Sequence, residues 1–350
     1  MPLVAHNGLP TFERLREEGL RVLPTARALH QDIRELHIGI LNMMPDAALA
    51  ATERQFLRLV GESNSIAQFY VHLFTLPELA RGAEAQAHID AYYESFEDIR
   101  AAGLDALIIT GANVTGPELS NQPFWEPLKE VIAWAEQAVP STLCSCLATH
   151  AVLEFRHGQT RVPQPRKVWG VFEHHVVEDR HPLVNDVDDL FHVPHSRWNA
   201  VTRAQFDAAG HRVLAESEEA GVHLAVSGDG LRFVFFQGHP EYDLISLLKE
   251  YKRDLMQWHA GKGDEPPYPQ HYLNPTQRAI LREYRNRLVA GTAGEFPEHL
   301  VAPGLVNTWH DTAEAVIDNW MGAIYQVTHR DRKKAFMDHI DPANPLGLNW

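Results

Sequence analysis

The segment STLCSCLATHAVLEFRHG (141–158) decides the fold class. Its first residues, 141–146, are small or apolar, as in a buried strand, and the following residues have helical periodicity up to Gly158. A strand that runs directly into a helix is half of a βαβ unit. Cys146 falls at the corner between the two elements.

Similar units precede this segment. Apolar runs over Glu35–Met44 and Leu104–Ala112 are typical of strands covered on both faces. We also expect a strand over Ile66–Phe74 and helices that begin at Thr52 and that span 91–103 and 123–139. Strands that alternate with helices of this length predict a three-layer α/β sandwich with a mostly parallel sheet.

The second half of the chain is less regular. Strand-like runs at 167–177, 211–217, 221–227 and 231–238 include a hairpin turn at SGDG (227–230). Helices are expected over 244–259, 276–289 and 307–326, the last with Trp309, Trp320 and Tyr325 either in the core or at a dimer interface. We divide the chain into an N-terminal segment (1–34), an α/β catalytic domain (35–260), and a linker with C-terminal helices packed on that domain (261–350).

Composition excludes several classes of protein. The 350 residues include 31 Lys and Arg and 46 Asp and Glu, so the formal net charge is −15. An acidic balance disfavours nucleic-acid and anionic membrane partners, because both need a basic face. No apolar run approaches the roughly 18 residues of a membrane span, no signal peptide is recognisable, and two cysteines one residue apart make no disulfide framework. We expect a cytoplasmic protein.

Cys146 is the candidate nucleophile. A helix N-terminus presents unpaired N–H groups and partial positive charge, which favour the reactive thiolate. The backbone N–H of Leu147 is placed to hold an oxyanion when sulfur attacks a carbonyl. The alternative is that Cys146 is a small buried apolar side chain, which is the interpretation we keep for Cys144 inside the strand.

A base and its orienting group follow another strand. In FVFFQGHPEYD (233–243), His239 and Glu241 come directly after an apolar strand, and in an extended segment their side chains point the same way. Carboxyl ends of parallel strands share one edge of the sheet, so Cys146, His239 and Glu241 are expected to meet there. A surface loop with two polar residues is the alternative.

Other polar clusters are weaker candidates. Glu173, His174 and His175 lack the spaced partners of a zinc site, so no metal is expected. The segment VPHSRW (193–198) is predicted to be a loop that lines a pocket, and Arg253 is placed to bind a carboxylate. No glycine-rich phosphate loop is present.

Long stretches of the chain resemble the homoserine O-acyltransferases of the MetA type, the homoserine O-succinyltransferase family. Matching polar as well as apolar residues run through almost the whole chain, in QDIRELHIGILNMMP (31–45), STLCSCLATHAVL (141–153), GVFEHH (170–175), PHSRW (194–198), GHPEYD (238–243) and NTWHDTAEAVIDNWMGAIYQVT (307–328).

The resemblance implies a class I glutamine-amidotransferase-like (flavodoxin-like) fold and methionine biosynthesis. It implies transfer of an acyl group from succinyl-CoA to L-homoserine through an acyl-cysteine, with acyl-CoA as co-substrate, no other cofactor, and a homodimer. Cys146, His239 and Glu241 match the family's nucleophile, base and triad partner. The family's substrate contacts match Lys167, Ser196 and Arg253.

Two departures from the family pattern bear on specificity. Many relatives carry two lysines where Pro45 is here followed by Asp46, Ala47 and Ala48. The position that is typically Gly in succinyl enzymes and Glu in acetyl enzymes is Thr115. Threonine lacks the carboxylate that would repel a succinyl group, so we expect succinyl-CoA; acetyl-CoA, a glutamine amidotransferase and a non-catalytic binding protein are the alternatives.

Overall fold

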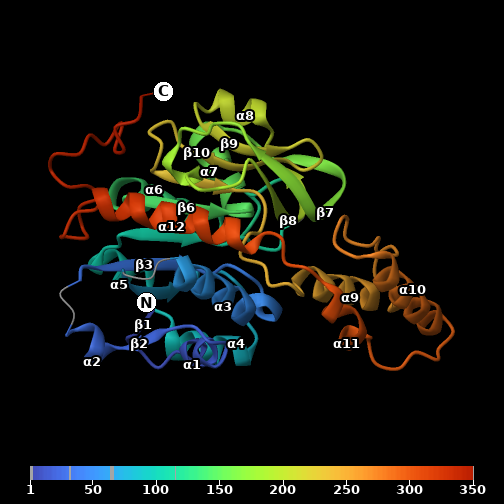
Figure 1. Ribbon diagram of the computed structural model, residues 1–350. Helices are drawn as coiled ribbons and strands as arrows, with labels where there is room; N and C mark the ends of the chain where they lie inside the picture. Colours follow the sequence, from blue (N-terminus) through green and yellow to red (C-terminus); the bar gives the residue numbers. More distant parts are fainter. Residues whose placement is uncertain (1–2, 31–32, 64–66, 115, 350) are drawn as a thin grey trace.

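The computed structural model describes residues 3–30, 33–63, 67–114 and 116–349. In this part of the chain eleven strands form one sheet, in the order β2-β1-β4-β3-β5-β6-β11-β10-β9-β7-β8 (Figure 1). The strands are β1 (Leu3–Ala5), β2 (Val22–Pro24), β3 (Glu35–Leu41), β4 (Gln68–Phe74), β5 (Ala106–Ile109), β6 (Ser141–Ser145), β7 (Val162–Val176), β8 (Leu190–Ala200), β9 (Arg212–Ser217), β10 (Gly221–Val226) and β11 (Phe233–Phe236).

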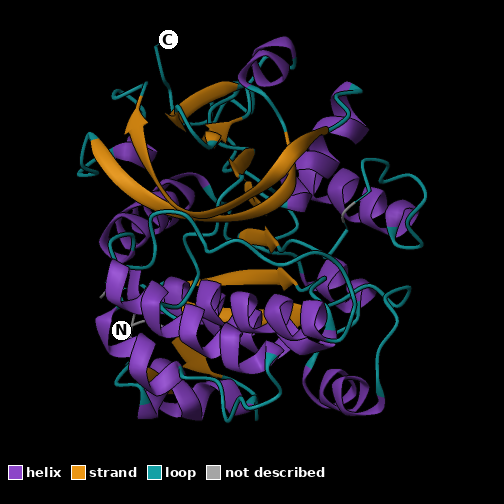
Figure 2. Ribbon diagram, turned by 90° about the vertical axis from the view of Figure 1, so that its right-hand side faces the viewer, coloured by secondary structure: helices purple, strands orange, loops and turns teal. Residues whose placement is uncertain are grey.

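The sheet has a parallel part and an antiparallel part. The pairs from β2 to β11 in the sheet order are all parallel, and β6 and β11 lie in register from Thr142↔Phe233 to Ser145↔Phe236. From β11 onward, β10, β9, β7 and β8 pair antiparallel. The two longest of these, β7 and β8, form the long curved ribbons of Figure 2. The predicted α/β class with a mostly parallel sheet is confirmed, and so is the hairpin turn between β10 and β11.

Helices cover both faces of the parallel strands. One apolar cluster joins the sheet to three helices, α1 (Pro10–Glu17), α3 (Asp46–Ser63) and α12 (His310–Val327). Helices α3 and α12 lie in front of the strands in Figure 1. The second cluster covers the opposite face with α5 (Phe96–Ala102), α6 (Trp125–Ala138), α7 (Leu147–His157) and α8 (Arg203–Ala208). The short remaining elements are α2 (Thr25–Ala28), α4 (Ala83–Tyr92), η1 (Pro182–Val184) and η2 (Ala302–Gly304).

Three further helices pack on the antiparallel part and stand apart in Figure 1: α9 (Ser246–His259), α10 (Pro275–Val289) and α11 (Glu298–Val301). They share a third apolar cluster with Trp169 and Val171 of β7. Gly170 makes this contact possible: its φ is 148°, and a Cβ there would lie 2.2 Å from the carbonyl oxygen of Gln270. Strands β1 and β2 join the same sheet, and α12 joins its core. The division of the chain into the segments 1–34, 35–260 and 261–350 stays a prediction.

Three local predictions are wrong. Helix α3 begins at Asp46 rather than Thr52, because Ala47 and Ala48 are good helix formers directly after Pro45. The helix expected over 91–103 is broken at Tyr93, whose ψ is 147°, and restarts at the Ser95 cap. The segment 193–198 is a strand, not a loop, because an edge strand such as β8 tolerates Pro194.

The late tryptophans belong to the core. Trp309 and Trp320 are 2% and 0% exposed, whereas Tyr325 is 41% exposed. The Trp320 indole N–H donates to Ser141 Oγ at 2.7 Å and thereby ties α12 to the start of β6. Among the described residues, no helix is long and apolar enough to cross a membrane.

Candidate active site

Cys146 stands at a strained corner between β6 and α7. Its φ of 51° and ψ of −105° lie outside the regions that non-glycine residues normally occupy, at a cost of about 1–3 kcal/mol. Hydrogen bonds hold the corner: the Cys146 N–H donates to Phe236 O at 2.7 Å, and the Thr149 hydroxyl lies 2.8 Å from Cys144 O and 2.9 Å from Phe236 O. The sheet therefore fixes the direction of the Cys146 side chain.

His239 and Glu241 lie at the end of β11, the strand next to β6. His239 Nδ1 and Glu241 Oε1 are 2.7 Å apart, and both residues are buried. The segment is a turn, closed by the Tyr242 N–H on His239 O at 3.1 Å, rather than the extended chain that we expected. The predicted contact between base and carboxylate is nevertheless present.

The side chain of Cys146 lies close enough to His239 for its charge to act on the imidazole. Burial favours the neutral form of His239, but the charges of Glu241 and Cys146, with the hydrogen bond to Glu241, outweigh burial and raise the pKa of His239 well above its usual value. A charged imidazolium is therefore placed between a carboxylate and the sulfur. Cys144, by contrast, is completely buried, and burial raises the pKa of its thiol, so it remains protonated.

The backbone around His239 is tightly packed. The His239 N–H donates to Pro194 O at 2.7 Å, and the Trp309 indole donates to Tyr242 O at 3.0 Å. Gly238 has no room for a side chain, because a Cβ there would lie 2.5 Å from Val193 Cγ1 and 2.8 Å from His195 Nε2. Strand β8 thus supports the base from behind.

Leu147, the predicted oxyanion donor, is the first residue of α7. Leu147 begins the helix, so its N–H has no intrahelical partner. Gly111, after β5, lies against this corner: a Cβ there would lie 3.5 Å from Cys146 Cβ and 3.9 Å from Leu147 N. A side chain at this position would narrow the approach to the sulfur.

A second cluster surrounds the carboxylate of Glu250 on α9. Lys167 Nζ lies 3.1 Å from Glu250 Oε2, Ser196 Oγ donates to the same oxygen at 2.6 Å, and Tyr242 OH donates to Oε1 at 2.7 Å. Burial disfavours the charged form, but Lys167 and these hydrogen bonds outweigh it and lower the pKa of Glu250. Lys167 and Ser196, two of the predicted substrate contacts, therefore both bind Glu250, a residue that we did not predict.

Arg253 lies one helical turn after Glu250. Its guanidinium is half exposed and pairs with Asp254 at 2.8 Å. Lys167 Nζ lies 3.7 Å from a carboxylate oxygen of Asp254. Lys167, Ser196 and Arg253 therefore belong to one cluster of charges, which we call the Glu250 cluster, built from β7, β8 and α9.

Arg161 holds the loop that precedes α6. Its Nε and Nη2 donate to the carbonyls of Pro117 at 3.2 Å, Val114 at 3.2 Å and Gly116. Burial lowers the pKa of Arg161, opposed by the charges of Cys146 and Glu154. Thr115, the predicted determinant of acyl specificity, lies outside the described residues, but the carbonyls on either side of it accept from Arg161.

Arg197 is a buried cation on β8. Its Nη2 donates to Ala220 O, whereas Nε and Nη1 have no partner among the described residues. Burial lowers its pKa to about 10, and only the charge of Cys146 opposes this. The neutral imidazoles of His174 and His195, 3.1 Å apart, lie nearby. His174 is thus part of this buried layer instead of a zinc site with Glu173.

Arg81 lies against the segment that follows β3. It reaches the end of β3 from the loop after β4, with Nη1 2.5 Å from Met44 O and 3.3 Å from Asp46 Oδ1, and Nη2 3.1 Å from Thr75 Oγ1. No periodicity or motif singles out Arg81, Arg161, Arg197 or Glu250, because each is defined by contacts with distant segments.

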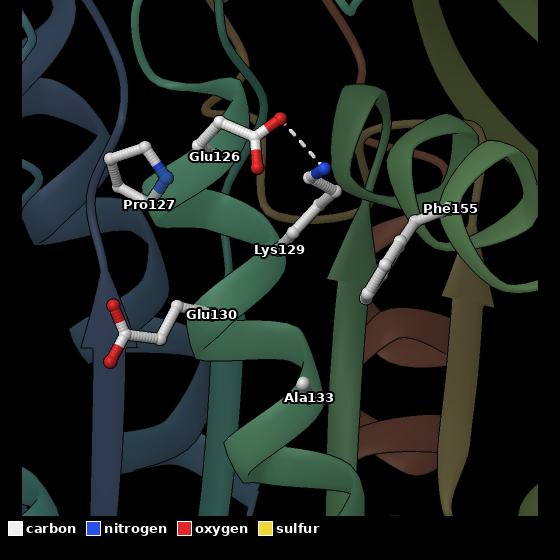
Figure 3. Close-up of a pocket in the computed structure, with 6 residues that line it drawn as sticks. All are labelled: Glu126, Pro127, Lys129, Glu130, Ala133 and Phe155. Carbon is white, nitrogen blue, oxygen red and sulfur yellow. Dashed lines mark ion pairs between the residues drawn. The ribbon is translucent and has the colours of Figure 1, made fainter.

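The depression in Figure 3 lies elsewhere, between α6 and α7. It is lined by Glu126, Pro127, Lys129, Glu130, Ala133 and Phe155, and an ion pair of 2.7 Å joins Glu126 to Lys129. It contains none of the three residues Cys146, His239 and Glu241. We assign no role to it.

Comparison with known proteins decides the family. The model of the family "Homoserine O-succinyltransferase" matches residues 2–330. The chain belongs to this family. The homoserine O-succinyltransferase of Thiobacillus denitrificans is 68% identical, over 99% of this chain and 100% of the relative. That of Allochromatium vinosum is 65% identical, over 99% of both, and that of Cardiobacterium hominis is 50% identical, over 99% of both. The predicted resemblance to homoserine O-succinyltransferases is confirmed.

Solved structures are more distant from this family member. A glutamine amidotransferase from Thermotoga maritima aligns with a TM-score of 0.42 and 12% identity, over 83% of this chain and 98% of the other. One from Methylobacillus flagellatus aligns with a TM-score of 0.46 and 13% identity, over 83% and 95%. The fold assignment therefore depends on the sheet order described above.

Proposed function

We propose that the protein transfers the succinyl group of succinyl-CoA to the hydroxyl of L-homoserine through an acyl-cysteine at Cys146. The contact of His239 with both Cys146 and Glu241 carries this proposal, and membership of the homoserine O-succinyltransferase family supports the choice of substrates. Succinyl-CoA is a co-substrate, and the residues described above perform the chemistry without another cofactor.

In the first half-reaction, the Cys146 thiolate attacks the thioester carbon. The Leu147 N–H stabilises the oxyanion, and the CoA thiolate leaves and takes the proton of the His239 imidazolium. In the second half-reaction, neutral His239 removes the hydroxyl proton of homoserine, and the alkoxide attacks the acyl-cysteine. Collapse of the tetrahedral intermediate releases O-succinylhomoserine and restores the thiolate beside the imidazolium.

The Glu250 cluster has the charges that homoserine needs. Arg253 and Lys167 bind the carboxylate of the amino acid, and Glu250 accepts from its ammonium group. The Lys167 ammonium has three donors, of which two face Glu250 and Asp254, so one remains for substrate. Ser196 donates to the same oxygen of Glu250 as Lys167 and helps to hold the carboxylate in place.

Arg161 is suited to the distal carboxylate of the succinyl group. Its Nε and Nη2 hold the loop around Thr115, which leaves Nη1 for a ligand. Its charge is close enough to act on Cys146. An arginine that can pair with the distal carboxylate, together with the lack of a charge on the side chain of Thr115, favours succinyl-CoA over acetyl-CoA.

The test is the intact mass of the protein after incubation with succinyl-CoA alone. We expect an adduct of about 100 Da, the mass of a succinyl group, as covalent catalysis requires. Cys146→Ala should carry no adduct, whereas Cys144→Ala, the matched control, should carry it in full. Absence of an adduct together with release of ammonia from glutamine would instead indicate a glutamine amidotransferase.

We also propose a cellular location and an oligomeric state. We expect the protein to act in the cytoplasm, since neither Cys144 nor Cys146 is in a disulfide. The resemblance to the family also favours a homodimer, which sedimentation of the purified protein would reveal.

A further inference from the structure

A cluster of metal-binding side chains lies on the parallel sheet away from the catalytic cysteine. His6 follows β1, His72 lies on β4, and Glu94 follows α4. One nitrogen of each imidazole and one carboxylate oxygen all lie within 4.8 Å of one another. In the sheet, β3 and β5 separate β4 from β6, so these residues take no part in the acyl-transfer chemistry.

His72 is oriented from both sides. Its Nδ1 lies 2.6 Å from Glu94 Oε1, and its Nε2 lies 2.8 Å from His37 Nδ1. His37 Nδ1 can accept a hydrogen bond from His72 Nε2–H, which leaves the lone pair of His72 Nδ1 for a metal ion. Metal-binding histidines are commonly held in this way by an acceptor behind the ring.

His6 has the same arrangement with the backbone. Its Nδ1 lies 3.1 Å from Val4 O, and a carbonyl only accepts, so Nδ1 carries the proton. The lone pair is therefore on Nε2, whose single contact among the described residues is Asn7 Nδ2 at 3.5 Å. The ring centroids of His6 and His72 are 5.0 Å apart.

Glu94 supplies the negative charge. Its Oε1 lies 2.6 Å from His72 Nδ1. Its place is fixed by the backbone, because the Glu94 N–H donates to Leu73 O at 2.7 Å. Two imidazoles and one carboxylate are a common ligand set for Zn²⁺, with water in the fourth position.

The spacing is compatible with such an ion. Bonds of about 2.0–2.1 Å in a tetrahedral site place ligand atoms roughly 3.4 Å apart. The distances here range from 2.6 Å, between His72 and Glu94, to the 4.8 Å limit that includes His6. Small rotations of these partly buried side chains close that gap, with the ion in place of the proton that His72 and Glu94 otherwise share.

We propose that His6, His72 and Glu94 form a zinc site that joins the end of β1 to β4. Within the described parts of the chain, β1 pairs with β4 through one register pair, Leu3↔Phe69, so an ion bound to His6 would fix β1 more firmly to the sheet. The role is structural: zinc stabilises the folded chain because the unfolded chain lacks the assembled ligands.

The experiment uses the full chain with Cys146→Ala, which removes the thiol that also binds zinc. Titration with Zn²⁺ should show one equivalent bound in the micromolar range and an increase in melting temperature of several degrees. At 100 times the dissociation constant, linkage predicts about 2.7 kcal/mol. Glu94→Gln and His72→Gln should each weaken binding at least 10-fold, whereas His299→Gln, on an exposed helix end, should not.

Two further measurements test whether these three side chains bind the metal. Binding should weaken below pH 6.5, because zinc displaces protons from the imidazoles, and Co²⁺ should give the visible absorption of a tetrahedral site. In the chain with Cys146 intact, His72→Gln should retain acyl transfer within about twofold, which also shows that it folds. Equal zinc binding by the His72→Gln and parent proteins, or no binding below millimolar zinc, would mean that the cluster is only a hydrogen-bonded network.

Discussion

The two halves of the active site are constructed differently. Cys146 directly follows β6, and His239 and Glu241 lie in the turn after β11, the neighbouring parallel strand. The Glu250 cluster joins β7, β8 and α9, and Glu250 lies 83 residues from Lys167 and 54 from Ser196. The reacting groups therefore depend on short, local geometry, whereas acceptor binding depends on how the antiparallel part packs against α9.

This difference has a functional consequence. The centre that reacts with both substrates is rigid, since hydrogen bonds from β11 and α7 hold it. The groups that distinguish the substrates are placed at its margins, Arg161 for the donor and the Glu250 cluster for the acceptor. Substitutions should therefore affect both half-reactions in the first region and only one of them in the second.

The largest effect is expected from Glu241→Gln. Loss of the carboxylate charge removes the support of the His239 imidazolium, and kcat should fall about 10³- to 10⁴-fold in both half-reactions. The charge pair of sulfur and imidazolium becomes less favourable, so the pH at which Cys146 reacts half-maximally with iodoacetamide should move upward. An unchanged alkylation profile would contradict the assigned role of Glu241.

The raised pKa of His239 also makes the stability of the fold depend on pH. Because the folded state raises the pKa of His239, protonation of this residue stabilises the fold most below pH 6.5, and the contribution is lost as pH rises through the raised pKa. Glu241→Gln should therefore destabilise the protein more at pH 6 than at high pH, as urea unfolding at several pH values would measure.

Arg161→Gln separates donor recognition from the chemistry. Loss of a buried charge-assisted pair of about 2–3 kcal/mol predicts a decrease of roughly 100-fold in kcat/KM for succinyl-CoA. Acetyl-CoA, which lacks the distal carboxylate, should lose less. The ratio of O-succinyl to O-acetyl product from an equimolar mixture of donors measures the change, and an unaltered ratio would exclude Arg161 as the carboxylate contact.

Glu250→Gln should affect only the acceptor. The amide keeps the shape but not the charge, so the KM for homoserine should rise about 10- to 100-fold, the value of one charge-assisted hydrogen bond. The rate at which succinyl-CoA acylates Cys146 should stay within about twofold. Glu283→Gln, the same substitution on the exposed face of α10, is the control. Slower acylation of Cys146 in Glu250→Gln would show that the two regions are coupled.

The smallest effect concerns the packing that joins the regions. In Gly238→Ala, the new methyl group meets Val193 and His195, and overpacking of this kind costs about 1–3 kcal/mol. Gly322→Ala in α12 is the matched control, because a Cβ there has no neighbour within 4 Å and should stabilise the helix by about 0.5–1 kcal/mol. Urea unfolding of both variants tests the contrast.

The same comparison explains what could be predicted from the sequence. The corner at Cys146 and the pair His239 and Glu241 are visible as polar residues at strand ends, and the structure brings all three together. Lys167 was expected only through the family resemblance, whereas Arg253 and the segment with Ser196 were also weaker candidates from the sequence itself. Glu250 was missed, because a glutamate on an amphipathic helix is usually solvated and its partners lie on strands far away in the chain.

Some local errors have equally physical causes. Pro194 made β8 resemble a loop, although a proline is compatible with the edge of a sheet. Thr52 resembled a helix cap, although the helix already begins at Asp46 after Pro45. Such patterns record local preference, and tertiary pairing determines which preference prevails.

The backbone of Cys146 has a consequence for the history of the protein. With φ at 51°, this position is one where glycine would relieve strain, so folding and catalysis favour different residues at the same site. Selection for a more heat-resistant fold alone would tend to replace the nucleophile. Cysteine persists at this corner only as long as the cell depends on the product.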